Sequence, residues 1–523
     1  MNFTQAVDPG TPTRPELGTA EDAACSSRGR SPDASPQQGQ WRTLLAPFYT
    51  GGRPVLPLIL LFCLLNATVL VNAVLHDGRI QYDDSGHIQN LKDYGNLRFP
   101  KPRDTIQFFC PPLPYIGPGL LAGWYVLDMY SATKIGQLIN VCLSLLLSYT
   151  LLRLLWWVSP DRPILRVAAV GLLTMLPVYY RTFSYVRGEP FVATFGLLSM
   201  YYTLRVFWGR ETSWPSAIKL GLAMGLTALS RQWGMLLLAA CAGFAFLCCL
   251  RNMRRQVPLL KAGVLASAVA LIAGGWFYVH LHVEHGSITA FNKPPSDRHK
   301  SPKFFLGGGN GELFRRPIRG SFDAHGAAVL YSDTWGDYWG YFLLGGRNPE
   351  DGSLVHGYGL KRARNNGTLH TPRTNAKGMA RYLGIVNAVA LLPSVIMGTG
   401  FLVSLLCVVR CFMLRPIGHD EALRILCATV VTTSLAGLAW FAMNYRISEH
   451  STIKATYILQ AFPPLAILGA YVLEGIHRLW PRAFRVLCML LVLAVCCIVP
   501  AWFTRYIPST LARFLERIDP FAF

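Results

Sequence analysis

Charged residues are scarce in this chain. Asp, Glu, Lys and Arg make up 15% of its 523 residues, whereas hydrophobic residues make up 52%. Soluble domains carry roughly a quarter charged residues, and here the deficit falls in long apolar runs. This composition excludes an ordinary soluble domain and is typical of a protein that crosses a membrane several times.

The chain also lacks a cysteine pattern that would indicate zinc or a disulfide framework. Most of its 13 cysteines lie inside apolar runs, where they act as small hydrophobic residues. No C-x-x-C motif is followed by a second pair, and Cys110 is the one cysteine that we place in an outward loop. We therefore expect no metal site and no cofactor.

The first 53 residues lack the apolar core of a signal peptide. They are rich in Pro, Ser, Gly, Gln and charged residues, so we expect residues 1–53 to form a disordered cytoplasmic tail. The net charge of +21 does not indicate nucleic acid as a partner, because Lys and Arg cluster in short connections such as 251–256, 408–415 and 477–485. Basic connections of this kind mark the cytoplasmic side of a membrane protein.

The apolar runs predict an all-α polytopic membrane protein. A helix of roughly 20 apolar residues crosses a hydrocarbon layer about 30 Å thick, and on this basis we expect about eleven spans. The predicted spans cover residues 54–75, 135–157, 164–180, 190–208, 214–230, 234–250, 260–282, 383–409, 425–443, 455–475 and 486–503. Together they form one transmembrane domain over residues 54–503.

Two long polar connections then face outward, over residues 76–134 and 283–382. Connections between adjacent helices usually have ~2–8 residues, so loops this long generally carry function. Within the first, residues 113–127 are amphipathic and too short to span, which predicts a helix lying in the membrane interface. Residues 504–523 would form an outward C-terminal segment.

The first outward loop opens with two adjacent carboxylates, Asp83 and Asp84. Such a pair suits a site that removes a proton from a hydroxyl group, because one acid can serve as the base while its neighbour orients it. The alternative is an exposed turn, since the residues of Asp-Asp-Ser-Gly favour turns. The spacing alone leaves both interpretations open.

The order of the motifs resembles the GT-C superfamily of polyprenyl-phosphate-sugar-dependent glycosyltransferases. That superfamily includes the protein O-mannosyltransferases and the lipid A aminoarabinose transferases. Its members have an Asp-Glu-x-x-His-like motif early in the first outward loop, which Asp83, Asp84 and His87 resemble, and then a Pro-Pro-Leu-Tyr-like element, here ending at Tyr115. The resemblance implies that Asp83 is the catalytic base and Asp84 its neighbour or substitute, with His87 and Tyr115 contacting the acceptor or the sugar.

Later elements extend the resemblance over residues 54–475. An Arg and an acid lie in a short outward connection, a Ser-Arg-Gln-Trp-Gly turn follows, and a Lys-x-x-Tyr element precedes Phe-Pro-Pro. The implied donor phosphate-binding residues are Arg181, Arg187, Arg231 and Lys454, with Glu189 at the sugar or acceptor. Cationic side chains at outward helix ends can bind a lipid phosphate by charge-assisted hydrogen bonds. The alternative is that they anchor helix ends at the interface.

The second outward loop contains aromatic residues beside carboxylates. Asp333, Trp335 and Asp337 fit a carbohydrate-binding site, in which aromatic rings stack on sugar faces and carboxylates bind hydroxyl groups. Trp and Tyr also mark membrane interfaces, which is the competing explanation. We consider these three residues candidates for the acceptor site.

The sequence thus predicts a glycosyltransferase that moves a sugar from a polyprenyl-phosphate donor to a lipid, glycan or protein acceptor outside the cytoplasm. Its expected location is the cell (inner) membrane, or the endoplasmic reticulum membrane in a eukaryote, and its partners would include membrane lipids but no nucleic acid. The main alternative is a transporter or flippase, which would need buried polar residues within broken spans. A scaffold or sensor is a second alternative, for which the acidic pair would be replaceable.

Overall fold

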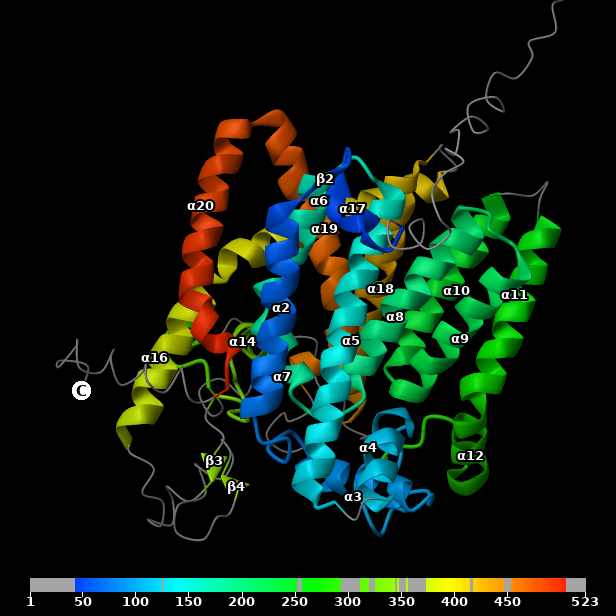
Figure 1. Ribbon diagram of the computed structural model, residues 1–523, viewed down its shortest axis with the longest axis vertical. Coiled ribbons are helices and arrows are strands. Elements are labelled where there is room, and N and C mark those ends of the chain that lie inside the picture. Colours follow the sequence, from blue (N-terminus) through cyan, green and yellow to red (C-terminus); the bar gives the residue numbers. More distant parts are fainter. Residues whose placement is uncertain are drawn as a thin grey trace, which may run out of the picture. The chain divides into compact units, whose positions relative to one another are not determined.

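The protein is an all-α polytopic membrane protein, shown as a computed structural model in Figure 1. The structure describes residues 43–124, 127–251, 256–292, 311–318, 325–343, 346–347, 354–355, 373–413, 417–445 and 453–504. The predicted cytoplasmic tail up to residue 42 and the predicted outward segment from residue 505 onward lie outside the described residues.

Eight helices in the described part of the chain are long and apolar enough to cross a membrane. These spans are α2 (Leu56–Leu75), α5 (Met129–Val158), α10 (Gly234–Arg251), α11 with α12 (Gln256–His285), α16 with α17 (Met379–Cys411), α18 (His419–Asn444), η7 with α19 (Ala455–Leu479) and α20 with η8 (Pro481–Trp502). The individual helices of the composite spans are α11 (Gln256–Ala270), α12 (Trp276–His285), α16 (Arg373–Val389), α17 (Leu391–Phe412), η7 (Ala455–Ala461), α19 (Phe462–Leu479), α20 (Pro481–Ile498) and η8 (Val499–Trp502).

The other three predicted segments are also helical but shorter or broken. Residues 164–180 correspond to α6 (Pro163–Thr174) and α7 (Pro177–Phe183), which are bent by 66° and bring the number of spans to nine if they count as one. Pro177 explains the break, because proline donates no N–H and disfavours helical backbone in the preceding residue. The remaining two are α8 (Glu189–Thr203, 15 residues), which continues through the π-turn η2 (Leu204–Trp208), and α9 (Trp214–Ser230, 17 residues).

Helix α19 forms the centre of the bundle and α20 its edge. In their apolar stretches, 83% of the residues of the α19 span are buried but only 11% of those of the α20 span. Gly400 allows α17 to approach α19 closely, since a Cβ there would lie 2.2 Å from the carbonyl oxygen of Leu468. Small residues at such crossings are how membrane helices pack tightly.

The first outward loop folds into two helices, α3 (Asp84–Gly95) and α4 (Leu113–Trp124). They pack through Gly95 and Gly119, where a Cβ on Gly95 would meet the Gly119 carbonyl oxygen at 2.5 Å. Helix α4 occupies most of the predicted interfacial segment. Figure 1 shows α3, α4 and α12 together at one end of the bundle. The charge pattern predicts that this end faces outward.

The second outward loop contributes η5 (Gly311–Phe314), α14 (Gly326–Trp335) and the strand pair β3 (Gly346–Arg347) and β4 (Leu354–Val355). Before α2, the chain forms η1 (Ala46–Phe48) and the antiparallel strands β1 (Tyr49–Thr50) and β2 (Arg53–Pro54). The prediction of a disordered tail over residues 1–53 is therefore wrong for its last residues. Arg166 of α6 is fully buried beneath these strands and donates to the Pro47 carbonyl at 2.9 Å and to the Thr50 hydroxyl. Those bonds explain how an arginine is tolerated in this predicted span.

Candidate active site

An ion pair joins the first outward loop to the start of the α19 span. Nζ of Lys454 donates to Oδ2 of Asp83 at 2.9 Å, across 371 residues of sequence. The lysine side chain is 7% exposed and the aspartate 28%, so solvent reaches the pair from the carboxylate side.

Electrostatics keep Asp83 ionised. Burial favours the neutral acid, but the charge and hydrogen bond of Lys454 outweigh it and hold the pKa of the Asp83 carboxyl well below its usual range. Burial lowers the pKa of Lys454, whereas Asp83 raises it, with a net increase. Asp83 also adopts a left-handed backbone (φ 54°) as the N-cap of α3, and its carbonyl accepts from the amides of Gly86 and His87.

Two tyrosine rings hold Lys454 beside a second cation, Arg187. Nζ of Lys454 lies 5.0 Å from the ring centre of Tyr82 and 5.5 Å from that of Tyr457. The guanidinium of Arg187 lies 5.5 and 5.8 Å from the same two rings. Aromatic faces attract cations, so the rings offset part of the repulsion between the two positive groups.

Glu189 links Arg187 to a third cation, Arg231. Its carboxylate accepts two hydrogen bonds from Arg187, at 2.7 and 2.9 Å, and lies 3.5 Å from Nε of Arg231. Gly188 makes the arrangement possible, because a Cβ there would lie 2.2 Å from the carbonyl oxygen of Ser230. The turn after α7 and the turn after α9 therefore meet at this glycine. We name Asp83, Lys454, Arg187, Glu189 and Arg231 the charged cluster.

Arg181 lies in a neighbouring buried group. Its guanidinium pairs with Asp333 at 3.0 Å, lies 3.6 Å from Asp337 and donates to the Gly336 carbonyl at 2.6 Å. Asp333 also accepts from the Tyr82 hydroxyl at 3.0 Å and from the amide of Ala455 at 2.7 Å. Burial raises the pKa of the Asp333 carboxyl. Asp333 thereby connects Tyr82, the residue before Asp83, with Ala455, the residue after Lys454.

Asp84 and Asp337 also accept hydrogen bonds from backbone amides close to them in sequence. Oδ1 of Asp84 accepts from the Ser85 amide at 2.7 Å. Oδ2 of Asp337 accepts from the amides of Phe342 and Leu343 at 2.8 and 2.7 Å, and Trp335 is buried with 1% exposure. The two bonds of Asp337 hold the loop after α14 together.

His87 and Tyr115 join α3 to α4 next to the charged cluster. Nδ1 of His87 lies 2.7 Å from the Tyr115 hydroxyl, and both side chains are fully buried. Burial raises the pKa of the neighbouring Cys110 thiol to about 11, and Nη1 of Arg231 donates to its sulfur at 2.8 Å. The thiol is therefore a neutral hydrogen-bond partner of Arg231.

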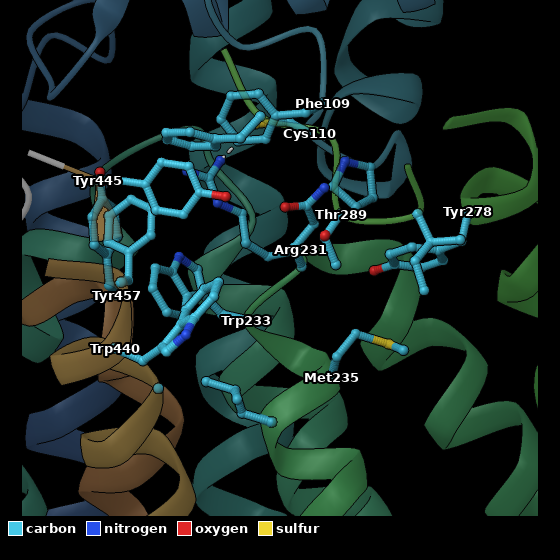
Figure 2. Close-up of a pocket in the computed structure, with 17 residues that line it drawn as sticks. Phe109, Cys110, Arg231, Trp233, Met235, Tyr278, Thr289, Trp440, Tyr445 and Tyr457 are labelled. Atoms are coloured by element: carbon cyan, nitrogen blue, oxygen red, sulfur yellow. Dashed lines mark hydrogen bonds between the residues drawn. The ribbon is translucent and has the colours of Figure 1, made fainter. Parts of the chain in front are cut away.

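An apolar cavity of about 220 Å³ adjoins the charged cluster at Arg231 and Tyr457. Figure 2 shows Arg231 and Cys110 among the aromatic side chains of Phe109, Trp233, Trp440, Tyr445 and Tyr457. The ring of Trp233 stacks on Tyr457, with centres 5.4 Å apart. The ring of Tyr457 thus lies near the cations Arg187 and Lys454 and also lines the cavity.

Sequence reasoning missed three contributors, namely Tyr82, Gly188 and Cys110. Each lies within or near a motif that was recognised for its charged residues. An aromatic residue directly before an acidic pair was the available signal for Tyr82. Among the described residues, no three His, Cys, Asp or Glu side chains are grouped so as to hold a metal ion.

Comparison with known proteins finds no matching family and no matching curated protein. Solved structures do match, including the oligosaccharyltransferase of Archaeoglobus fulgidus in complex with Zn and sulfate, at 14% identity, a TM-score of 0.43 and coverage of 86% of this chain and 53% of that chain. The archaeal oligosaccharyltransferase AglB from Archaeoglobus fulgidus, in complex with an inhibitory peptide and a dolichol-phosphate, matches at 14% identity and a TM-score of 0.39, with 87% of this chain and 56% of that chain covered.

ArnT from Cupriavidus metallidurans bound to undecaprenyl phosphate matches at 12% identity and a TM-score of 0.37, covering 89% of this chain and 88% of that chain. The chain thus spans about half the length of the archaeal enzyme. At identities this low, the role of each side chain has to be inferred from its own contacts.

Proposed function

We propose that this protein is a membrane glycosyltransferase that moves a sugar from a polyprenyl-phosphate carrier to an acceptor outside the cytoplasm. One observation carries the proposal: the Asp83–Lys454 pair belongs to a charged cluster that adjoins an apolar cavity at Arg231. A ligand that fits both parts has an anionic head and an apolar tail. A lipid phosphate has this composition, and its phosphate would bind the cations while its first apolar units occupy the cavity.

The charges of the cluster match such a donor. Lys454, Arg187 and Arg231 face the two carboxylates of Asp83 and Glu189, which leaves one positive charge in excess. Arg181 does not add to this excess because Asp333 pairs with it and Asp337 lies 3.6 Å away. A polyprenyl-phosphate sugar is a phosphodiester with a single negative charge. The resting cluster can therefore neutralise the intact donor.

The reaction would preserve this balance. The acceptor oxygen attacks the anomeric carbon, the bond from that carbon to the phosphate oxygen breaks, and Asp83 takes the proton of the nucleophile. The released lipid monophosphate can carry a second negative charge, while protonation of Asp83 removes one from the cluster. Lys454 is then free to leave Asp83 and bind the phosphate, where it stabilises the charge that develops on the leaving group.

Asp83→Asn in the purified protein tests this assignment, with Asp84→Asn as the matched control. We expect Asp83→Asn to lower sugar transfer by about 10²–10⁴-fold, the usual contribution of a general base, while donor binding is retained. Asp84→Asn should have a much smaller effect, because it is Asp83 that pairs with Lys454, whereas Oδ1 of Asp84 accepts from the amide of Ser85 in its own helix. Full activity of Asp83→Asn would exclude Asp83 as the base.

The transporter alternative has its own test in liposomes. Transport of the lipid-linked sugar across the bilayer with no covalent product would contradict the transferase proposal. Mass spectrometry of glycans and lipids from cells that lack the protein should reveal the missing product, and with it the class of the acceptor.

A further inference from the structure

Within the part of the chain that the structure describes, one ring nitrogen of His87 has no hydrogen-bond partner. The ring is fully buried on α3, and its Nδ1 is held by Tyr115. Its Nε2 is also buried, and no hydrogen-bond partner for it exists in the part of the chain that the structure describes. Buried polar atoms are nearly always hydrogen-bonded, so an orphan beside a candidate active site points to a ligand or to ordered water.

Arg187 shows the same feature. Its Nε and Nη2 atoms bind Glu189, whereas Nη1 is buried without a partner among the described residues. The charges of Arg187 and Arg231 shift the pKa of the His87 ring, and so do those of Asp83 and Lys454. The two orphan nitrogens therefore belong to one electrostatic environment, in which three of the four charged groups are cations.

This environment keeps the imidazole neutral. Burial lowers the pKa of His87, and Arg187 and Arg231 lower it further, whereas Asp83 opposes them. A neutral imidazole carries one N–H, which can lie on either ring nitrogen. If the Tyr115 hydroxyl donates to Nδ1, the proton lies on Nε2 and makes it a donor.

Resting on the function proposed above, we propose that Nε2 of His87 donates a hydrogen bond to a phosphate oxygen of the lipid-linked donor, beside Nη1 of Arg187. A bound phosphate accepts hydrogen bonds, so only the Nε2–H form makes a favourable contact with it. Tyr115 is then a positioning residue that fixes this form. The histidine adds a donor without adding a fourth positive charge, which preserves the match to a singly charged phosphodiester. The role differs from the sugar or acceptor contact that the sequence motif implies for His87.

Binding of farnesyl phosphate and of farnesol to the full-length protein in nanodiscs tests this inference. We expect His87→Leu to weaken farnesyl phosphate binding about ten- to hundredfold, the usual effect of losing a hydrogen bond to a charged group. Farnesol binding should not change. His87→Gln, which keeps an N–H donor, should remain within about threefold of the wild type on the same grounds. His280→Leu, a histidine of α12 that stacks on Phe99, is the control and should bind as the wild type does.

The outcomes separate this inference from the proposed function. Unchanged farnesyl phosphate binding in His87→Leu overturns the inference, and if sugar transfer is nevertheless lost, His87 acts on the acceptor or as a base. Weakened binding supports the inference even if the wild-type protein transfers no sugar, in which case the proposed function fails alone. Should His87→Leu not fold, Tyr115→Phe carries the test, with weaker farnesyl phosphate binding expected and unchanged binding overturning the proposal.

Discussion

At the scale of the residue, pairing with Lys454 keeps the Asp83 carboxylate ionised throughout the physiological pH range. The pKa of Asp83 lies well below its usual range, so its carboxylate stays ionised as the pH falls through the region where ordinary carboxyl groups take up protons. The stabilisation from this pair is present above the pKa of an unfolded aspartate and is lost only as the pH falls through the lowered value. A base with so low a pKa is weak until Lys454 moves away from it.

Replacing Lys454 should reveal the titration of Asp83. In Lys454→Met we expect transfer to fall by about 10²-fold or more, because one stabilising contact to the leaving phosphate is lost. The pKa of Asp83 should rise, since burial favours the neutral acid and its partner is gone. The pH–rate profile of the wild type should be flat from about pH 5 to 8 as far as Asp83 is concerned, whereas that of the variant should decline toward pH 5. Profiles of identical shape would show that the pair does not control Asp83.

Asp333 is better explained as a positioning residue than as an acceptor contact. Its two oxygens are used by Arg181, Tyr82 and the Ala455 amide, which leaves the acceptor little to bind. Asp333→Asn should destabilise the protein by about 3–5 kcal/mol, because Arg181 stays buried with a weakened partner. Thermal unfolding in detergent measures this loss. A variant with unchanged stability but a raised acceptor KM would instead support the acceptor role.

At the scale of the element, the long apolar helices could be predicted because length and hydropathy depend on local sequence. The 66° break between α6 and α7 was not predicted, although Pro177 signals it. Helix α3 was missed because its polar sequence resembles a loop, and it forms by packing on α4. Asp83, Lys454 and Arg231 were named from their motifs. The pairing of Arg181 with Asp333, 152 residues away, could not be predicted, since local sequence does not encode which distant segments meet.

The meeting of two turns at Gly188 gives a prediction at this scale. An alanine there would place its Cβ 2.2 Å from a backbone oxygen, so the turns that carry Arg187 and Arg231 must separate. We expect Gly188→Ala to cost about 1–3 kcal/mol of stability and to lower transfer more than stability alone explains. Gly243→Ala on α10 is the matched control, because nothing lies within 4 Å of its Cβ position. Equal activity per folded molecule for the two variants would mean that the site tolerates the separation.

At the scale of the whole molecule, the two ends of the bundle differ in their polar contacts. The end opposite α3 and α4 is tied by Asp420 at the start of α18, which accepts from Ser159 at 2.6 Å and Tyr471 at 2.8 Å and pairs with Arg162 at 2.8 Å. Glu474 of α19 adds a pair with Arg478 at 2.7 Å. The contacts of Asp420 join α18 to α19 and to the connection between α5 and α6, at the end where the basic connections predict the cytoplasm. The charged cluster lies at the other end, which is predicted to face outward, so an opening there for a lipid-linked donor would leave these contacts intact.

This orientation can be tested by labelling single cysteines with a reagent that does not cross membranes. Leu97 follows α3 and is 79% exposed, and Trp480 lies between α19 and α20 and is 63% exposed. In intact cells, or in vesicles of known orientation, we expect Leu97→Cys to be labelled from the non-cytoplasmic side and Trp480→Cys only after the membrane is permeabilised. The unmodified protein gives the background from its native cysteines. Labelling of Trp480→Cys without permeabilisation, with Leu97→Cys protected, would place the charged cluster on the cytoplasmic side and contradict an acceptor outside the cytoplasm.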